Sequence, residues 1–379
     1  MKQLNLQITA KCNFNCKHCF NAADNAPLLQ ELRYEEICQI LDAVKEKGID
    51  ELTITGGEPM LHKDFLKIMD AIYARGMTVF DLNTNGYFIT REMLDHFKEI
   101  GCDPLIKISF DGLGYHDWMR GTRNIEAHTL EKIRLCLACG FRVMIQYNVN
   151  RTNLSTVEKT VEMFDEMGCF EVRLIRTTES ARWAQNAPDG SLTWEEYYDL
   201  GLQLIRKLLE KPRKIKLVIW QFASVHFQEK YYQFIPVKGQ PETFYTDLPL
   251  CDEANYMLAV AANGDVYPCL QFSGTARARG IYYGNILTDG LDSLLKGSSY
   301  HEFTSLTVED RIRAFEKCRT CRYLKYCCGG CPALALLSTG NVIGYDLSKC
   351  IAFEKGYFEK LKSVFPEDWY CTTRMSGIS

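Results

Sequence analysis

Three cysteines near the N-terminus stand at a spacing that suits an iron–sulfur cluster. Cys12, Cys16 and Cys19 form a C-x3-C-x2-C motif directly after residues 4–9, which alternate apolar and polar side chains like a β-strand. Three thiolates on one loop can hold three irons of a 4Fe–4S cluster, and the fourth iron then has no protein ligand. Such an iron can coordinate a small molecule directly. The motif therefore predicts a metal centre that binds a ligand.

A structural zinc site is the alternative for this triad. His18 precedes Cys19, and three cysteines with one histidine are a common zinc ligand set. Structural zinc sites, however, usually pair their ligands as C-x2-C with a second pair far along the chain. The spacing of the triad favours the iron–sulfur cluster.

A second group of cysteines lies in the last third of the chain. Eight of the 17 cysteines fall between Cys251 and Cys350, and part of them follow the pattern C-x2-C-x5-C-x3-C. In a reducing compartment, so many cysteines indicate metal binding or catalysis rather than disulfides. A zinc ribbon is again the alternative. Cys136 and Cys139 also form a C-x2-C pair, but they lie within a predicted helix. We expect their side chains to pack in the hydrophobic core of the protein.

Composition and charge narrow the function classes. The 379 residues carry a formal net charge of -4, which predicts no nucleic-acid partner. The N-terminus lacks a signal peptide's apolar core, and no apolar run is long enough for a membrane span. A cytoplasmic protein is therefore expected, without a membrane partner.

Periodicity predicts an α/β fold built as a partial (β/α)6 barrel over residues 1–180. The expected strands are 4–9, 51–55, 78–82, 105–110, 143–149 and 171–175, and the expected helices are 34–47, 64–75, 91–100, 126–139 and 156–167. Residues 181–250 are expected to form a connector with a helix at 194–209 and a strand at 215–220. Residues 251–379 are expected to form a small Cys-rich domain. In parallel sheets, function gathers after the strands' C-termini.

Further motifs follow the predicted strands. They are Thr55-Gly56-Gly57-Glu58-Pro59, Asn83-Thr84-Asn85-Gly86, Ser109-Phe110-Asp111-Gly112, His116-Asp117 and Arg120-Gly121. With the cysteine triad, they resemble the radical S-adenosylmethionine (SAM) superfamily. The resemblance implies that SAM chelates the open iron and that reduction of the cluster cleaves SAM to a 5′-deoxyadenosyl radical. The SAM contacts that it implies are His18, Gly56, Gly57, Glu58, Asn85, Ser109, Arg120 and Leu174. His18 stands where the family usually has an aromatic residue.

The C-terminal cysteines, with Gly264-Asp265-Val266-Tyr267-Pro268-Cys269, resemble the SPASM domain of peptide-modifying radical SAM enzymes. That resemblance implies two auxiliary 4Fe–4S clusters, hence three clusters in all. The distal cluster would be held by Cys318, Cys321, Cys327 and Cys350, and the proximal one by Cys251, Cys269 and Cys331. The proximal cluster would then have an open iron, or a fourth ligand from Cys328, Cys371 or a peptide substrate.

The same resemblance implies an oxidoreductase that matures a ribosomally synthesised peptide by hydrogen abstraction, through a cross-link or another oxidative modification. In sulfatase-maturating enzymes, the cysteine that matches Cys269 is followed by an aspartate that acts as the catalytic base. This chain has Leu270 at that position. Sulfatase-type maturation is therefore only an alternative. An enzyme acting on a small molecule or a tetrapyrrole is another, and a non-catalytic electron carrier is a third.

The expected partners follow from that function. Because the chain starts at the first barrel strand, no fused peptide-recognition domain is expected. Leader recognition would come from a separate leader-binding protein or from the 181–250 connector, or the enzyme would work without it. A reductant such as flavodoxin or ferredoxin would supply the electron.

Overall fold

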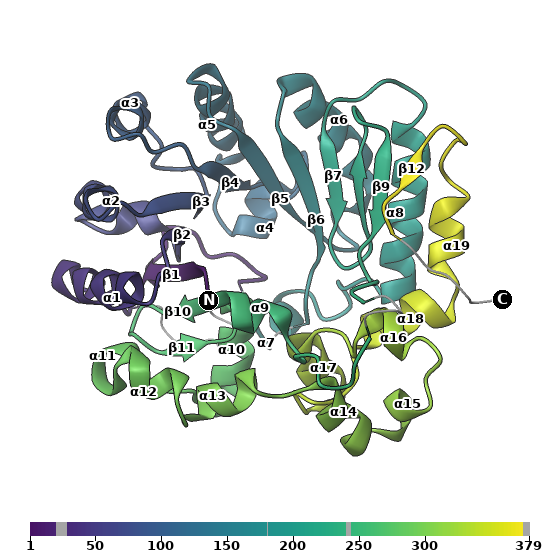
Figure 1. The fold of residues 1–379 in the computed structure, drawn as a ribbon. Helices are drawn as coiled ribbons and strands as arrows, with labels where there is room; N and C mark the ends of the chain where they lie inside the picture. Colours follow the sequence, from purple (N-terminus) through teal and green to yellow (C-terminus); the bar gives the residue numbers. More distant parts are fainter. Residues whose placement is uncertain (20–28, 180, 240–243, 374–379) are drawn as a thin grey trace. The chain divides into compact units, whose positions relative to one another are not determined.

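The computed structural model describes residues 1–19, 29–179, 181–239 and 244–373 (Figure 1). The chain divides into two compact units. The first unit comprises Met1–Gln146, Thr178–Asp189 and Glu253–Thr304, and the second comprises Tyr147–Thr177, Gly190–Asp252 and Ser305–Ser379.

The first unit is built on a mostly parallel sheet. Its strands are β1 (Gln3–Thr9), β2 (Glu51–Gly56), β3 (Thr78–Thr84), β4 (Leu105–Ser109), the first part of β5 (Val143–Val149), β10 (Met257–Val260) and β11 (Val266–Tyr267). They lie in the order β11-β10-β1-β2-β3-β4-β5, and every neighbouring pair is parallel except β10 with β11. The segment with the SPASM-like motif thus extends the sheet beyond β1.

Helices follow the parallel strands of this unit in turn. They are α1 (Tyr34–Glu46), α2 (Phe65–Ala74), α3 (Arg91–Glu99), α4 (His116–Arg120), α5 (Glu126–Ala138), α7 (Ala181–Asn186), α10 (Leu270–Ala278), α11 (Ile286–Asp289), α12 (Leu291–Leu295) and α13 (Ser299–Thr304), with the short 3₁₀ helix η1 (Pro59–Leu61). The helix α9 (Asp252–Tyr256) leads into β10. Figure 1 shows α1, α2, α3 and α5 along the outer side of the strands.

Alternation along the strands separates an apolar from a polar face. On β1, Leu4, Leu6 and Ile8 are fully buried, and the residues between them are polar. The apolar stripe of α1, which includes Ile37 and Leu41, is buried as well. An apolar strand face and an apolar helix stripe can be buried against each other. Their mutual burial fixes the register of each βα unit.

The second unit holds the remaining strands. They are β6 (Glu171–Arg176), β7 (Lys216–Ile219), β8 (Ala223–His226), β9 (Tyr231–Phe234) and β12 (Tyr370–Cys371). The strand β7 is parallel to β6, β8 and β9 run antiparallel, and β12 is parallel to β9. The helices are α6 (Val157–Met167), α8 (Trp194–Leu208), α14 (Val308–Ala314), α15 (Glu316–Arg319), α16 (Leu324–Cys327), α17 (Pro332–Thr339), α18 (Leu347–Glu354) and α19 (Tyr357–Lys362), with the 3₁₀ helix η2 (Leu154–Thr156).

The predicted fold class is confirmed, because the chain is an α/β protein with a mostly parallel sheet and a Cys-rich C-terminal region. All six predicted strands are present as β1–β6, and the expected helix and strand of the connector are α8 and β7. The hairpin of β8 and β9 was not predicted. In the described residues, no helix is both long and apolar enough to cross a membrane.

Candidate functional site

The cysteine triad lies on the loop that follows β1. Cys12 and Cys19 pack against an apolar cluster formed by Phe14, Cys16 and Ile125. All three cysteines are free thiols. Burial raises the pKa of Cys12 to about 12 and also raises that of Cys16. The loop therefore favours neutral thiols until a metal supplies positive charge, as expected of a site whose ligands lose their protons on metal binding.

Hydrogen bonds from two other segments hold this loop. The main-chain N–H groups of Asn15 and Lys17 donate to the carbonyls of Arg120 (3.2 Å) and Met119 (3.0 Å). On the other side, Nε of Arg182 donates to the carbonyl of Cys16 at 2.9 Å. Because these bonds use main-chain atoms, they fix the course of the loop and leave its thiols available for iron.

Arg120 makes two further contacts beneath the triad. Its Nε lies 2.6 Å from Oδ2 of Asp111, and both side chains are almost completely buried. Its Nη1 lies 3.7 Å from Sγ of Cys16. The guanidinium therefore places a positive charge beside a predicted cluster ligand. Its predicted contact with the carboxylate or ribose of SAM stays a prediction.

His116 belongs to the same support. Its buried ring stacks on Phe110 with the centroids 4.6 Å apart, and its Nδ1 accepts the main-chain N–H of Asp111. Burial lowers the pKa of His116 well below its ordinary value. A neutral ring that accepts at Nδ1 positions Asp111, and through it Arg120.

The Gly56-Gly57 segment lies directly against the triad loop. Its N–H groups at Gly57 and Glu58 donate to the carbonyls of Thr9 (2.7 Å) and Lys11 (2.8 Å). A Cβ on Gly57 would lie 2.3 Å from the carbonyl oxygen of Lys11, which is closer than such atoms can approach. A glycine is therefore required for the two loops to meet.

The carboxylate of Glu58 joins these loops to the end of β3. It is fully buried and accepts the Thr84 hydroxyl (2.8 Å) and the Asn85 N–H (2.7 Å). Burial raises its pKa to about 7. The Asn85 amide in turn donates to Oδ1 of Asn13 (2.8 Å) and lies 3.9 Å from Sγ of Cys12. Glu58 thus orients Asn85 at the triad, and a direct SAM contact for Glu58 stays a prediction.

The other predicted SAM contacts occupy separate places. Nδ1 of His18 is buried and has no hydrogen-bond partner among the described residues, and burial lowers the pKa of His18. An orphaned buried nitrogen next to Cys19 fits a site that receives a ligand. Ser109 ends β4, where it pairs with Gln146. Leu174 is fully buried on β6 in the second unit.

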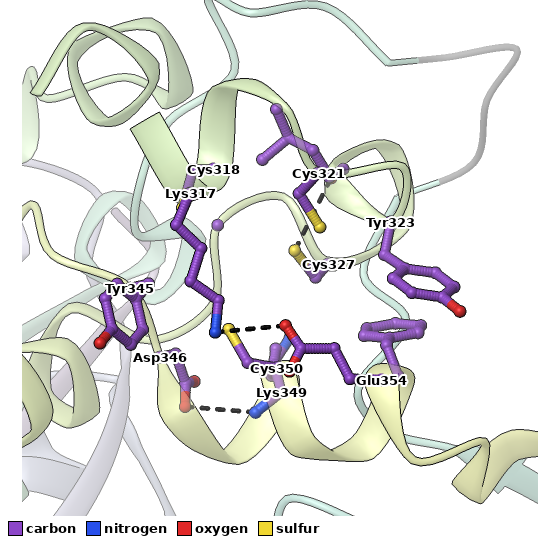
Figure 2. Close-up of a pocket in the computed structure, with 13 residues that line it drawn as sticks. Lys317, Cys318, Cys321, Tyr323, Cys327, Tyr345, Asp346, Lys349, Cys350 and Glu354 are labelled. Carbon is purple, nitrogen blue, oxygen red and sulfur yellow. Dashed lines mark hydrogen bonds and ion pairs between the residues drawn. The ribbon is translucent and has the colours of Figure 1, made fainter. Parts of the chain in front are cut away.

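Four cysteines of the second group line a pocket within the second unit (Figure 2). Its lining includes the four cysteines predicted to hold the distal cluster, which are Cys318, Cys321, Cys327 and Cys350. Burial raises the pKa of Cys327 and of Cys350 to about 12. In the described part of the chain, no three His, Cys, Asp or Glu side chains lie close enough to hold a single metal ion. Thiols that surround a common space fit a polynuclear cluster.

The cysteines predicted for the proximal cluster are divided between the units. Cys269 precedes α10 in the first unit, whereas Cys251 and Cys331 belong to the second. Their common cluster therefore stays a prediction. Of the candidate fourth ligands, Cys328 is buried with a left-handed backbone (φ 45°). Cys371 lies on β12 and donates to the carbonyl of Thr373.

Leu270 begins α10 and is almost completely buried. Its apolar side chain has no proton-accepting group at the position of the sulfatase-maturase base. The lower rank of sulfatase-type maturation stays a prediction that rests on this residue type.

Sequence reasoning missed the contacts made by α7. Arg182 and Asn186 of this short helix reach the main chain of the triad loop at Cys16 and Lys17. Six residues carry too little periodicity to reveal such a helix, and an arginine far along the chain gives no signal of its partner.

Family models match two regions of the chain. Residues 6–164 match the Radical SAM superfamily, and residues 251–322 match the SPASM iron–sulfur cluster-binding domain. The first match contains the triad and the strand-end motifs. The second contains four of the seven predicted auxiliary ligands.

Two curated relatives come from Methanosarcina barkeri (strain Fusaro / DSM 804). An AdoMet-dependent heme synthase is 24% identical, over 89% of this chain and 93% of the relative. An Fe-coproporphyrin III synthase is 26% identical, over 93% of this chain and 88% of the relative.

Two solved structures share the fold. Streptococcus suis SuiB bound to the precursor peptide SuiA has a TM-score of 0.66 and 16% identity, covering 92% of this chain and 75% of SuiB. Native anSMEcpe with bound AdoMet and the Kp18Cys peptide has a TM-score of 0.66 and 18% identity, covering 96% of this chain and 99% of the other.

A first prediction concerns the link made by Glu58. We expect Glu58→Gln to lower the free energy of unfolding of the metal-free protein by about 1–3 kcal/mol, because in either orientation its amide NH2 group would face a main-chain N–H donor, that of Asn85 or that of Met60. Urea unfolding measures this change. The exposed Glu46 at the end of α1 provides the control Glu46→Gln, for which no loss is expected. Equal stability of the two variants would show that the carboxylate does not join the loops.

The matched regions and the geometry agree on the family. The triad and the motifs that support it lie within the first match, and the structure brings them together around one loop. The chain belongs to the radical SAM superfamily and carries a SPASM domain.

Proposed function

We propose that this enzyme generates a 5′-deoxyadenosyl radical and uses it to abstract a hydrogen atom from a ribosomally synthesised peptide, leaving a cross-link or another oxidative modification. The observation that carries the proposal is the convergence of Cys318, Cys321, Cys327 and Cys350 on one pocket, in a chain that also has the triad. An oxidative modification releases electrons, and a cluster in this pocket would accept them.

The residues of the chain have separate tasks in this proposal. Bound SAM and its cluster supply the radical chemistry. Cys12, Cys16 and Cys19 hold three irons, and Arg120 keeps a positive charge at Cys16. The close contact at Gly57 keeps the glycine-rich segment against the triad loop. The His18 nitrogen is available to a ligand.

A peptide substrate is supported by the two structures that share the fold, since each of those proteins is bound to a peptide. A separate leader-binding protein and a flavodoxin or ferredoxin reductant belong to the same proposal. So does a second auxiliary cluster on Cys251, Cys269 and Cys331. A cytoplasmic location agrees with the 17 cysteines, because a reducing compartment keeps thiols available for iron.

A tetrapyrrole substrate is the second candidate. It is supported by the two Methanosarcina relatives, whose names specify heme and Fe-coproporphyrin III and whose similarity extends over most of both chains. Sulfatase-type maturation ranks lower because of Leu270.

SAM cleavage tests the enzyme class. The iron-reconstituted protein is incubated with SAM and dithionite, and 5′-deoxyadenosine is measured by mass spectrometry. We expect it to form well above the level of a Cys12→Ala/Cys16→Ala/Cys19→Ala variant, because the triad holds the SAM cluster. Equal amounts of 5′-deoxyadenosine from the two proteins would contradict an enzymatic function and favour a non-catalytic electron carrier.

The auxiliary pocket gives a separate prediction. Cys350→Ala should lose about four iron atoms per chain, since a 4Fe–4S cluster with four thiolate ligands would lose one of them. It should still cleave SAM but form no modified product. Cys38→Ala on α1 is the control and should keep its full iron content. Full iron content in Cys350→Ala would contradict the assignment of this pocket to a cluster.

The substrate class is tested with two candidates in parallel. A short peptide encoded next to this gene and Fe-coproporphyrin III are each incubated with the enzyme, SAM and dithionite. We expect the peptide to lose the mass of hydrogen atoms and, when deuterated, to pass deuterium to 5′-deoxyadenosine. Loss of carbon dioxide from the porphyrin, with an unchanged peptide, would establish the second candidate instead.

A further inference from the structure

Three cationic side chains surround the pocket of four cysteines in the second unit. We name Arg311, Lys317 and Lys349 the cationic cage. Lys317 and Lys349 line the pocket, and Arg311 contacts Gly329, which also lines it. None of the three belongs to the predicted ligand set.

Arg311 is a buried cation that forms no direct ion pair with a carboxylate in the described residues, although the charge of Asp346 acts on it. It lies on α14 with no exposed surface. Its guanidinium donates to the main-chain carbonyls of Gly329, Val342 and Ile343. These bonds satisfy its N–H groups, but no acidic side chain in the described residues forms an ion pair with it. A buried charge without a counter-ion is costly, so an anion is expected nearby.

Lys349, which lines the pocket, is a second buried cation that donates to a main-chain carbonyl. Its side chain is 2% exposed, and its ammonium donates to the carbonyl of Pro236 at 2.9 Å. Within the described ranges, its ammonium makes no ion pair with a carboxylate. It directly precedes the ligand Cys350, and its charge acts on the thiol of Cys327.

Lys317 differs because it has a counter-ion at the surface. Its ammonium lies 3.2 Å from the carboxylate of Glu354, and both side chains are almost half exposed. Figure 2 shows this pair beside the sulfur of Cys350. The two opposite charges therefore lie at the same edge of the pocket, and each can be removed by a separate substitution.

The charges around the pocket leave an excess of positive charge. Against the three cations stand Asp346 and Glu354. The Asp346 carboxylate accepts the main-chain N–H groups of Cys331, Ser348 and Lys349 and the Ser348 hydroxyl. Its charge also acts on the Lys349 ammonium, but it forms no direct ion pair with it in the described residues. A 4Fe–4S cluster with four thiolates has a net negative charge that grows by one on reduction, and nearby charge is one of the factors that set its potential.

We propose that the cationic cage raises the reduction potential of the cluster held by Cys318, Cys321, Cys327 and Cys350, so that this cluster is an electron acceptor. This inference rests on the proposed auxiliary cluster. In the proposed reaction, a substrate radical that loses a proton and one electron becomes a closed-shell product. The cluster gains that electron, and the cage stabilises the added negative charge.

The test uses full-length protein with Cys12, Cys16 and Cys19 replaced by alanine, which removes the signal of the SAM cluster. An EPR-monitored redox titration follows the reduced auxiliary clusters. The signal that Cys350→Ala abolishes identifies the cluster in question. Because no substrate is needed, the result is independent of whether the enzyme acts on a peptide.

The variants change charge in both directions. At fixed potential, Lys349→Met should lower the ratio of reduced to oxidised cluster by on the order of tenfold, which is about 59 mV for a one-electron couple. Lys317→Met should lower it by about threefold, because its site is partly screened by water. Glu354→Gln should raise it by a similar factor. Lys207→Met provides the control at an exposed ion pair on α8 and should leave the ratio unchanged.

A merely structural role would change iron content but not this ratio. Opposite shifts in Lys317→Met and Glu354→Gln, at equal iron content, are the expected result. If the ratio of reduced to oxidised cluster in both Lys317→Met and Glu354→Gln equals that in Lys207→Met within experimental error, the proposal is overturned. This holds even if Lys349→Met fails to retain iron. Absence of the signal from the parent protein would instead refute the auxiliary cluster itself.

Discussion

A thiolate that is withdrawn from water needs positive charge close by, and both cysteine sites of this chain are built around that requirement. At the triad, burial disfavours the charged form of Cys12 and Cys16, and Arg120 is the protein's own cation beside Cys16. At the second pocket, the cationic groups of Arg311 and Lys349 are buried and form no ion pair with a carboxylate among the described residues. Iron would supply the remaining charge at each site, so the surroundings of these sulfurs fit metal ligands better than free thiols.

The same requirement explains why the triad loop is held by so many segments. Thiolates can bind a cluster with an open iron only if their loop keeps one shape. Main-chain bonds from Met119 and Arg120, a bond from Arg182 and the contact at Gly57 all fix that loop. The buried carboxylate of Glu58 extends this support to β3, since it binds the hydroxyl of Thr84 and the N–H of Asn85.

Much of this arrangement could be predicted from the sequence because its signals are local. The six strands have clear periodicity, and the motifs at Cys12, Gly57 and Asn85 directly follow strands in the chain. The ends of parallel strands meet at one edge of a sheet, so their convergence could be expected. The resemblance of the C-terminal cysteines to the SPASM domain likewise implied the set that lines the second pocket, which includes the distant Cys350.

What could not be predicted depends on contacts between distant residues. Arg182 reaches Cys16 across more than a hundred residues of sequence, and its helix is too short for a periodic signal. Glu58 gave no sign that its carboxylate would be enclosed by Thr84 and Asn85. The cations around the second pocket are ordinary residues in the sequence, and only folding shows that Arg311 is buried.

The central claim is that the triad holds a cluster whose open iron binds SAM. Electron–nuclear double resonance of the reduced full-length protein, with SAM labelled with ¹⁷O in its carboxylate, tests it directly. We expect a hyperfine coupling between the label and the cluster that disappears when Cys12, Cys16 and Cys19 are replaced by alanine. A reduced triad cluster that shows no coupling at saturating SAM would contradict it.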